Sequence, residues 1–250
     1  MATPNSYPGK SARRCECELP MKTALLFDLD GTLVDTDALH LTAFQSVLAA
    51  HGIKLTKAEY VEKIMGSSNA LIGAAFLPHL PLAEREAVLA TKEAAFRDML
   101  GELAPANGVT ALLDYAEAEG IRCAVVTNAP RANATVVLKA LGLAGRLPIQ
   151  IIGSELARSK PDPLPYLTGL AKTDAVAAHS VAFEDSLSGL RAAAGAGLAV
   201  VGLTTTLDEA TLLRAGAAIA VADFTDRRIF ALIQQRMAYT TGGVHLGSGE

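Results

Sequence analysis

Residues 27–35 read FDLDGTLVD, and this stretch decides the fold of the chain. It continues the apolar residues 24–26, and together they predict a short buried strand. Asp28 and Asp30 stand two positions apart, a spacing that turns both side chains to the same side of a strand. Two close carboxylates are costly to bury without a cation or hydrogen bonds, so the pair predicts a cation-binding site at the strand end. A calcium loop or a plain acidic turn has similar residues.

Three further segments lie at the end of an apolar run or in a loop, and together they favour the cation-binding site at the strand end over a calcium loop or an acidic turn. They are VVTN at residues 125–128, SKPDP at 159–163 and VAFEDS at 181–186. With FDLDGTLVD they resemble, in order, the four motifs of the haloacid dehalogenase superfamily, in its phosphoglycolate phosphatase and β-phosphoglucomutase-like branch. The resemblance covers roughly residues 21–235 and implies an enzyme, a phosphoric monoester hydrolase.

The pattern of apolar residues changes once along the chain. Residues 37–103 have helical spacing and no strand pattern, whereas helices and strands alternate after residue 108. Such alternation indicates parallel β-α-β units with right-handed crossovers. We therefore predict an α/β fold, a Rossmann-like parallel sheet core with an inserted α-helical cap domain, as the resemblance also implies. The predicted parts are a mobile N-terminal extension (1–20), the core (21–36 and 104–238), the helical cap (37–103) and a flexible C-terminal tail (239–250).

Individual elements follow from local signals. Thr56 and Glu59 predict a capping box that opens a helix. Gly120, Gly142 and Gly195 are expected in the left-handed conformation after helix ends. The expected helices include 69–76, 82–100, 109–119, 131–141, 163–172, 187–194 and 226–236, and the expected strands after the first are 122–126, 149–152, 179–183, 198–202 and 218–221.

The four motifs are expected to converge, because binding sites in open parallel sheets form at the carboxyl ends of the strands. Phosphoryl transfer needs a nucleophile in line with the leaving group, and Asp28 is placed to attack phosphorus and form an aspartyl-phosphate. Asp30 is placed to protonate the leaving oxygen and then to activate water. The alternative for Asp30 is an ordinary turn residue.

A phosphate dianion would be repelled by these carboxylates without a cation, and hard oxygen ligands together with phosphate favour Mg²⁺. The predicted metal ligands are Asp28, Asp30, Glu184 and Asp185. The resemblance implies that Asp30 contributes its backbone carbonyl. Whether Glu184 binds the metal directly or through water stays open.

The substrate phosphate is predicted to contact three further residues. Thr127 offers a hydroxyl and a backbone N–H, Asn128 an amide donor, and Lys160 a positive charge directed at Asp28. Seen alone, Thr127 and Asn128 would cap a strand end and Lys160 would be an exposed lysine. The motif context favours the functional interpretation for all three.

The cap is expected to choose the substrate and to exclude water. Its candidate specificity residues are His40, which follows the first motif by a helical turn or two, and Ser67 and Asn69, because residues 64–69 resemble the cap loop that reaches the substrate in this superfamily. His40 is equally well explained as a polar residue on a helix face. Arg131 is a candidate contact for a substrate anion or a solvated residue in the first turn of a helix.

Composition excludes other partners. The 22 Lys and Arg against 26 Asp and Glu give a net charge of −4, and there is no Trp, which disfavours nucleic acid and anionic membranes as partners. No apolar run reaches the roughly 18 residues of a membrane helix. The expected partner is a small phosphorylated metabolite, with a monomer as the default state. Cys15 and Cys17 form a C-x-C pair with no second cluster to complete a zinc site, and the scatter of the three cysteines, which include Cys123, fits a reducing, cytoplasmic compartment.

Several alternative functions need residues different from those of a phosphatase. A β-phosphoglucomutase-like phosphomutase would carry an arginine in the cap loop, and residues 66–70 contain none. A haloacid dehalogenase needs neither Mg²⁺ nor Asp30, a phosphonatase needs a cap lysine, and a non-catalytic binding protein of this fold usually lacks the nucleophile or an acid. The prediction is a Mg²⁺-dependent phosphatase, and the sequence leaves open whether it acts on phosphoglycolate or a sugar phosphate.

Overall fold

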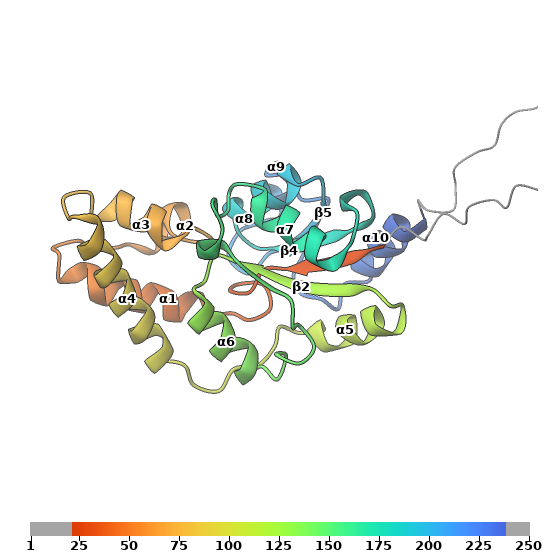
Figure 1. Cartoon of the computed structure of the whole chain (residues 1–250), viewed down its shortest axis with the longest axis horizontal. Helices are drawn as coiled ribbons and strands as arrows, with labels where there is room; N and C mark the ends of the chain where they lie inside the picture. Colours follow the sequence, from red (N-terminus) through yellow and green to blue (C-terminus); the bar gives the residue numbers. More distant parts are fainter. Residues whose placement is uncertain (1–21, 239–250) are drawn as a thin grey trace, which may run out of the picture.

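A parallel sheet forms the centre of the computed structural model, which describes residues 22–238 (Figure 1). The sheet has six strands in the order β3-β2-β1-β4-β5-β6, and every neighbouring pair is parallel. The chain therefore starts in the middle of the sheet and winds outward in both directions, the doubly wound order of Rossmann-like folds. The strands are β1 (Ala24–Phe27), β2 (Arg122–Thr127), β3 (Gln150–Ile152), β4 (Val181–Glu184), β5 (Ala199–Leu203) and β6 (Ile219–Val221).

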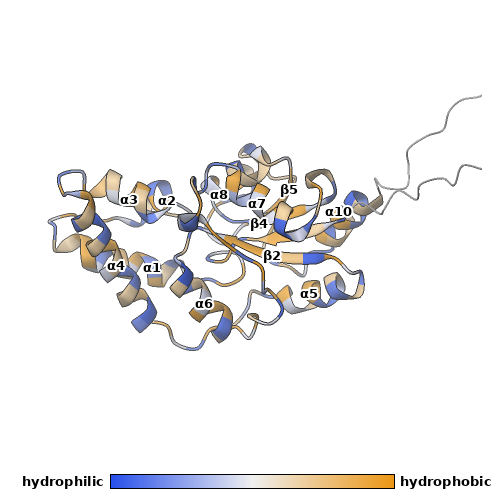
Figure 2. Ribbon diagram, viewed as in Figure 1, coloured by the Kyte–Doolittle hydropathy of each residue, from blue (hydrophilic) through white to orange (hydrophobic). Residues whose placement is uncertain are grey.

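Helices cover both faces of the sheet, so its strands are apolar on both sides (Figures 1 and 2). Leu25 and Phe27 of β1 pack in one buried cluster, and Ala24 and Leu26 pack in another on the opposite face. The first cluster includes α5 (Val109–Ala118), α6 (Arg131–Ala140) and α10 (Arg227–Ala238); the second includes α7 (Leu164–Thr173), α8 (Leu187–Gly195) and α9 (Glu209–Arg214). Two short 3₁₀ helices, Gly153–Glu155 and Ala177–His179, complete the connections.

Four helices between β1 and α5 lie beyond the carboxyl end of the sheet (Figure 1). They are α1 (Asp37–Ala49), α2 (Lys57–Lys63), α3 (Asn69–Phe76) and α4 (Leu82–Asp98). They build a third apolar cluster around Phe44, Leu48, Ile72 and Leu89. The predicted capping box is present, with Thr56 and Glu59 bonding reciprocally at the start of α2.

The structure confirms the fold class and the order of predicted elements, with two local corrections. Gly195 is the last residue of α8, and the left-handed glycine after that helix is Gly197 (φ +83°). The short helix α9 was not predicted, because its six residues span fewer than two turns of apolar spacing. The predicted segments 1–20 and 239–250, with Cys15 and Cys17, lie outside the described residues.

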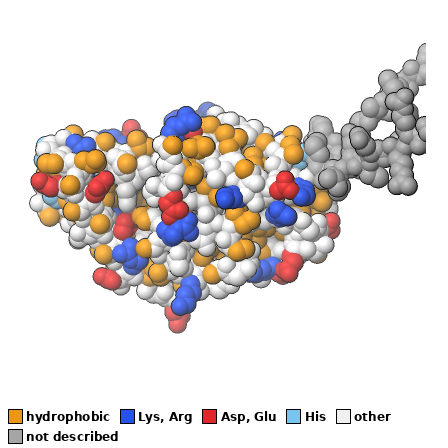
Figure 3. All heavy atoms as spheres, viewed as in Figure 1, with side chains coloured by type: hydrophobic (Ala, Val, Ile, Leu, Met, Phe, Trp, Pro, Cys, Tyr) orange, Lys and Arg blue, Asp and Glu red, His pale blue; other side chains and the backbone are white. Residues whose placement is uncertain are grey.

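Two further properties bear on partners. Within residues 22–238, the structure has no helix long and apolar enough to cross a bilayer. On the face drawn in Figure 3, the acidic and basic side chains are interspersed over the surface. This arrangement agrees with the small net charge of −4 and gives no field that would attract a polyanion to this face.

Candidate active site

Asp28 and Asp30 lie directly after β1, at the carboxyl end of the sheet. The backbone N–H of Asp28 donates to Phe183 O at 3.0 Å, so the pairing of β1 with β4 continues to the site. Gly31 then turns the chain with φ +78°, and a Cβ atom there would lie 2.1 Å from Asp185 Oδ2. Glycine therefore allows both the left-handed turn and the close approach of the β4 acid to the β1 loop.

The sheet topology gathers four buried charged side chains, which we name the sheet-edge cluster: Asp28, Lys160, Glu184 and Asp185. Lys160 Nζ lies 2.6 Å from Asp28 Oδ1 and 2.5 Å from Glu184 Oε1, and only 1% of Lys160 is exposed. The Tyr166 hydroxyl on α7 also donates to Glu184 Oε1, at 2.5 Å. The predicted lysine therefore reaches the predicted nucleophile across 132 positions of sequence.

Electrostatics in this cluster keep Lys160 charged. Burial would lower the pKa of Lys160, but Asp28 and Glu184 together raise it above its ordinary value. Burial raises the pKa of Asp28 well above its usual range, Lys160 opposes the rise, and Glu184 adds to it. Three carboxyl groups thus lie around one lysine, and Lys160 forms ion pairs with two of them, Asp28 and Glu184.

The donor set of the cluster fits a divalent cation. Carboxylate oxygens of Asp28, Glu184 and Asp185 lie within 4.8 Å of one another. Thr32 Oγ1 donates to Asp185 Oδ1 at 3.2 Å, whereas Asp185 Oδ2 is buried and has no hydrogen-bond partner within the described residues. Burial, with Asp28 and Glu184 nearby, raises the pKa of Asp185 well above its ordinary value. An orphaned carboxylate oxygen among other hard oxygen ligands fits a Mg²⁺ site.

Glu184 is the most completely buried acid of the cluster, with 0% exposure. Its Oε1 accepts from Lys160 and Tyr166, and its Oε2 accepts from Ser186 Oγ at 3.3 Å. A Cβ atom on Gly189 would lie 1.9 Å from the carboxylate, so the first turn of α8 leaves room for it. Both oxygens of Glu184 already have protein partners, unlike Asp185 Oδ2.

Asp30 faces away from the cluster, toward α1. Its Oδ1 accepts from Thr36 Oγ1 at 2.6 Å and lies 3.3 Å from His40 Nε2. Burial acts to raise the pKa of Asp30, but His40 and then Thr36 stabilise the carboxylate, and the pKa lies below its ordinary value. His40 stacks on Phe96 with ring centroids 3.9 Å apart, which holds the imidazole in place. His40 therefore lines the pocket beside Asp30, and its predicted role in specificity stays a prediction.

Thr127 and Asn128 reach the site at the end of β2, but their side chains have partners in the chain. Thr127 Oγ1 accepts from the N–H of Ala129 at 3.0 Å. Asn128 Nδ2 donates to Gly66 O at 2.9 Å and to Lys160 O at 3.2 Å, and its Oδ1 accepts from Lys160 N–H at 3.3 Å. The geometry gives Asn128 a positioning role for the lysine loop and the cap loop, and its predicted phosphate contact stays a prediction.

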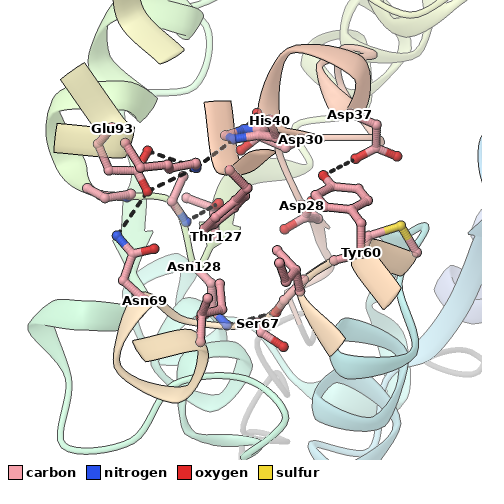
Figure 4. A pocket seen from close by; sticks show the side chains of 18 residues that line it. Asp28, Asp30, Asp37, His40, Tyr60, Ser67, Asn69, Glu93, Thr127 and Asn128 are labelled. Atoms are coloured by element: carbon pink, nitrogen blue, oxygen red, sulfur yellow. Dashed lines mark hydrogen bonds and ion pairs between the residues drawn. The ribbon is translucent and has the colours of Figure 1, made fainter. Parts of the chain in front are cut away.

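The helices α1, α3 and α4 form the opposite side of the pocket, with four polar residues that we name the helical wall: His40, Asn69, Lys92 and Glu93. Figure 4 labels three of them, His40, Asn69 and Glu93. Lys92 Nζ lies 2.9 Å from His40 Nδ1, and 3.1 and 3.2 Å from the two oxygens of Glu93. Asn69 Nδ2 donates to Glu93 Oε1 at 2.9 Å. The pocket between the wall and the sheet edge has a cavity volume of about 70 Å³.

The side chains of two other predicted residues, Ser67 and Arg131, are bonded to groups of the chain outside the helical wall and the sheet-edge cluster. Ser67 lines the pocket, but its hydroxyl donates to Lys63 O at 3.3 Å. Arg131 is half-exposed and forms a bidentate pair with Glu155, at 2.6 and 2.7 Å. The interpretation of Arg131 as a solvated residue in the first turn of a helix agrees with this geometry.

Comparison with known proteins identifies the family. The model of the haloacid dehalogenase-like hydrolase family matches residues 25–203, well over half of the chain. This chain belongs to that family. The sequence prediction of the superfamily is confirmed, and all residues of the sheet-edge cluster lie inside the matched segment.

Individual relatives of this haloacid dehalogenase-like hydrolase include phosphatases. It is 36% identical to the protein CbbY of Cereibacter sphaeroides over 192 residues, which cover 71% of this chain and 82% of CbbY. It is 32% identical to a phosphoglycolate phosphatase of Xylella fastidiosa, over 70% of this chain and 76% of that enzyme. A crystal structure of a CbbY mutant from Rhodobacter sphaeroides in complex with xylulose-(1,5)-bisphosphate superimposes with a TM-score of 0.71 at 30% identity, covering 82% and 96% of the two chains.

Four site residues escaped the sequence prediction. Thr36 and Tyr166 bond Asp30 and Glu184, and neither belongs to a motif. Lys92 and Glu93 stand among other charged residues of α4, which obscures them. One signal could have identified Lys92: it shares a helical face with Leu89 and Phe96 at spacings of three and four, so it faces the interior.

Proposed function

We propose that this chain is a Mg²⁺-dependent phosphatase that hydrolyses a small phosphomonoester through an aspartyl-phosphate on Asp28. The observation that carries the proposal is the sheet-edge cluster, in which Lys160 contacts Asp28 and a buried oxygen of Asp185 has no partner. Membership of a hydrolase family and relatives that are phosphatases support the same reaction class.

Asp28, Asp185 and the backbone carbonyl of Asp30 are the groups that we propose to hold Mg²⁺. When bound, the ion would neutralise the carboxylates and withdraw negative charge from the phosphoryl oxygens. Glu184 has Lys160, Tyr166 and Ser186 as partners, which favours a supporting role that orients Lys160 and contacts the ion through water. The sequence leaves open whether Glu184 binds the metal directly or through water, and we propose the contact through water.

In the first step, a carboxylate oxygen of Asp28 attacks phosphorus, and the bond from phosphorus to the ester oxygen breaks. The leaving oxygen takes a proton from Asp30 and departs as an alcohol. In the second step, Asp30 takes a proton from water, whose oxygen attacks phosphorus and breaks the bond to Asp28. The products are the alcohol and inorganic phosphate, and both aspartates return to their starting forms.

Asp30 must change surroundings to act as an acid. In this structure Thr36 and His40 favour its carboxylate form, which suits the base that activates water. If its side chain turns from these two residues toward the leaving oxygen, the stabilising contacts are lost and its pKa rises. The contacts of Asp30 are therefore consistent with one residue serving both steps in turn.

We further propose that residues 37–103 act as a cap domain over the core. The supporting contact is the hydrogen bond of 2.9 Å from Asn128 Nδ2 to Gly66 O, which joins the loop before α3 to the end of β2. A Cβ atom on Gly66 would lie 2.3 Å from Ser186 Oγ, so this loop sits directly on the core. A cap in this position limits water in the pocket during transfer.

The test is release of inorganic phosphate from a panel of phosphomonoesters, with Mg²⁺ or with EDTA. We expect turnover with Mg²⁺ and a loss to background with EDTA. Asp28→Asn should lower the rate by about 10⁴-fold or more, because it removes the proposed nucleophile. Circular dichroism of the variant checks that it is folded. Unchanged turnover in Asp28→Asn would contradict the proposed mechanism.

A further inference from the structure

Asn69 presents an acceptor to the pocket because Glu93 determines how its amide is oriented. An ionised carboxylate only accepts hydrogen bonds, so the amide nitrogen of Asn69 must face Glu93 Oε1, at 2.9 Å. The amide oxygen then faces the interior of the pocket (Figure 4). Within residues 22–238, no group donates a hydrogen bond to this oxygen in the structure. It is free to accept a hydrogen bond from a bound molecule.

Glu93 is itself held from the core side of the pocket. Asn133 of α6, which is 1% exposed, donates from Nδ2 to Glu93 Oε2 at 2.6 Å. Arg97 Nη1 donates to Asn133 Oδ1 at 2.7 Å, so the orientation of the Asn133 amide is determined as well. A chain of hydrogen bonds from Arg97 through Asn133 and Glu93 therefore leaves Asn69 one orientation.

The same wall offers no uncommitted positive charge. Lys92 is the only Lys or Arg that lines the pocket within the described residues, and Glu93 and His40 occupy its ammonium group. Tyr60 donates its hydroxyl hydrogen to Asp37 Oδ1 at 3.0 Å. Like the amide oxygen of Asn69, its oxygen can therefore only accept a hydrogen bond from a molecule in the pocket. The remaining lining on this side includes the apolar side chains of Phe44, Ile64, Met65 and Ile72.

We infer that Asn69, oriented by Glu93, selects phosphomonoesters whose alcohol half carries an uncharged hydroxyl group, and disfavours those that carry a carboxylate or a second phosphate. The inference rests on the proposed phosphatase function and specifies its substrate class as polyol or sugar monophosphates. A hydroxyl can donate to Asn69 Oδ1, whereas an anion would face acceptor oxygens and apolar groups without a partner. CbbY, whose structure contains a bisphosphate, makes the bisphosphate comparison the most demanding one.

The experiment compares kcat/KM for esters that differ in one group. The pairs are glycerol 3-phosphate with 3-phosphoglycerate, erythritol 4-phosphate with 4-phosphoerythronate, and xylulose 5-phosphate with xylulose 1,5-bisphosphate. We expect the less charged member to be preferred at least about tenfold in each pair, since sites built for a hydroxyl discriminate strongly. Propyl phosphate, which has no hydroxyl, measures the transfer chemistry without this contact.

Variants then assign the preference to the two residues. Asn69→Leu should raise KM for glycerol 3-phosphate about tenfold and leave propyl phosphate within about twofold. Glu93→Gln should lower the ratio of kcat/KM for glycerol 3-phosphate to that for propyl phosphate, because a glutamine can also donate and lets the Asn69 amide turn. The ratio cancels any general effect of Glu93→Gln on the chemistry. Asn107→Leu, at an exposed site that does not line the pocket, is the matched control and should change neither value.

Preference for the carboxylate or bisphosphate member, or an unchanged ratio in Asn69→Leu, would overturn the inference while leaving the phosphatase function standing. A protein that releases phosphate from none of these esters, propyl phosphate included, would overturn the proposed function, and this inference with it. The two failures are therefore distinguishable in one set of assays.

Discussion

The sheet-edge cluster and the helical wall are both buried and charged, but they differ in how their charges are balanced. In the cluster, Lys160 contacts Asp28 and Glu184, and the third acid, Asp185, has an oxygen, Oδ2, without a partner in the described part of the chain. In the wall, Lys92 and Glu93 pair with each other, Lys92 also contacts His40 Nδ1, and Glu93 accepts from the neutral amides of Asn69 and Asn133. The cluster therefore calls for an added cation, whereas the wall is complete without one. This difference separates the part of the site that we propose performs the chemistry from the part that we propose selects the substrate.

Removal of the lysine from the cluster should have the largest effect. Lys160→Met leaves Asp28 and Glu184 buried without their cation, which should lower kcat by about 10³-fold and destabilise the protein by about 3–5 kcal/mol. Phosphate release and urea unfolding measure the two effects. Lys22→Met, which breaks an exposed pair with Asp174, is the matched control and should change neither. A near-normal rate in Lys160→Met would contradict the catalytic role that we propose for the sheet-edge cluster.

Neutralising an acid of the cluster should stabilise the metal-free protein. The pKa of Asp185 is higher in the folded than in the unfolded chain, so its contribution to stability is lost as the pH rises above the ordinary aspartate value. In EDTA at pH 8, Asp185→Asn should therefore be more stable than the parent by roughly 1–2 kcal/mol, and the gain should shrink toward pH 5. Thermal unfolding at several pH values measures this gain.

Addition of Mg²⁺ completes that experiment. The parent should gain thermal stability from the ion, more at pH 8 than at pH 5, because binding requires deprotonated ligands. Asp185→Asn should gain little and should release almost no phosphate. Equal stabilisation of both proteins by Mg²⁺ would show that Asp185 is not a ligand.

Displacement of the loop that joins the two regions should have a smaller effect. Gly66→Ala introduces a Cβ atom 2.3 Å from Ser186 Oγ, so the loop must move off the core and KM should rise about tenfold. Gly52→Ala is the matched control, because it has a similar positive φ (+73° against +70°) and no atom within 4 Å of the new Cβ. Equal effects of the two changes would assign the loss to backbone strain rather than to the contact between loop and core.

Arg131→Ala should have the smallest effect. The guanidinium is paired with Glu155 outside the pocket, so kcat/KM should stay within about twofold of the parent for every ester tested. A selective loss for a carboxylate or bisphosphate substrate would place Arg131 in the binding site and weaken the contrast between an acidic cluster and a neutral wall.

The sheet and its cluster could be predicted from the sequence because their signals are local. Strand ends in a parallel sheet meet at one edge, so the four motifs implied a common site before any contact was known. Asp28 and Lys160 are far apart in sequence, yet each lies in a motif that specifies its place. The approach of Asp185 to the β1 turn also has a local cause, since Gly31 leaves the space for it.

The partners within the wall could not be predicted in the same way. The pairing of Glu93 with Asn69 and with Asn133 depends on how α4 packs between α3 and α6, and residues on different helices carry no mutual spacing signal. Asn128 shows a second limit: its motif marks a phosphate site, whereas its amide contacts Gly66 and Lys160. Hydrogen-bond partners across elements are set by tertiary packing.

The most direct test of the central claim is to trap the covalent intermediate on Asp28. Protein turning over a reactive phosphomonoester with Mg²⁺ is quenched in acid, reduced with borohydride and digested for mass spectrometry. An aspartyl-phosphate is reduced to homoserine, so we predict homoserine at position 28, with Mg²⁺ and substrate present and not in EDTA. Reduction at another acidic residue, or steady turnover with position 28 unmodified, would contradict the account.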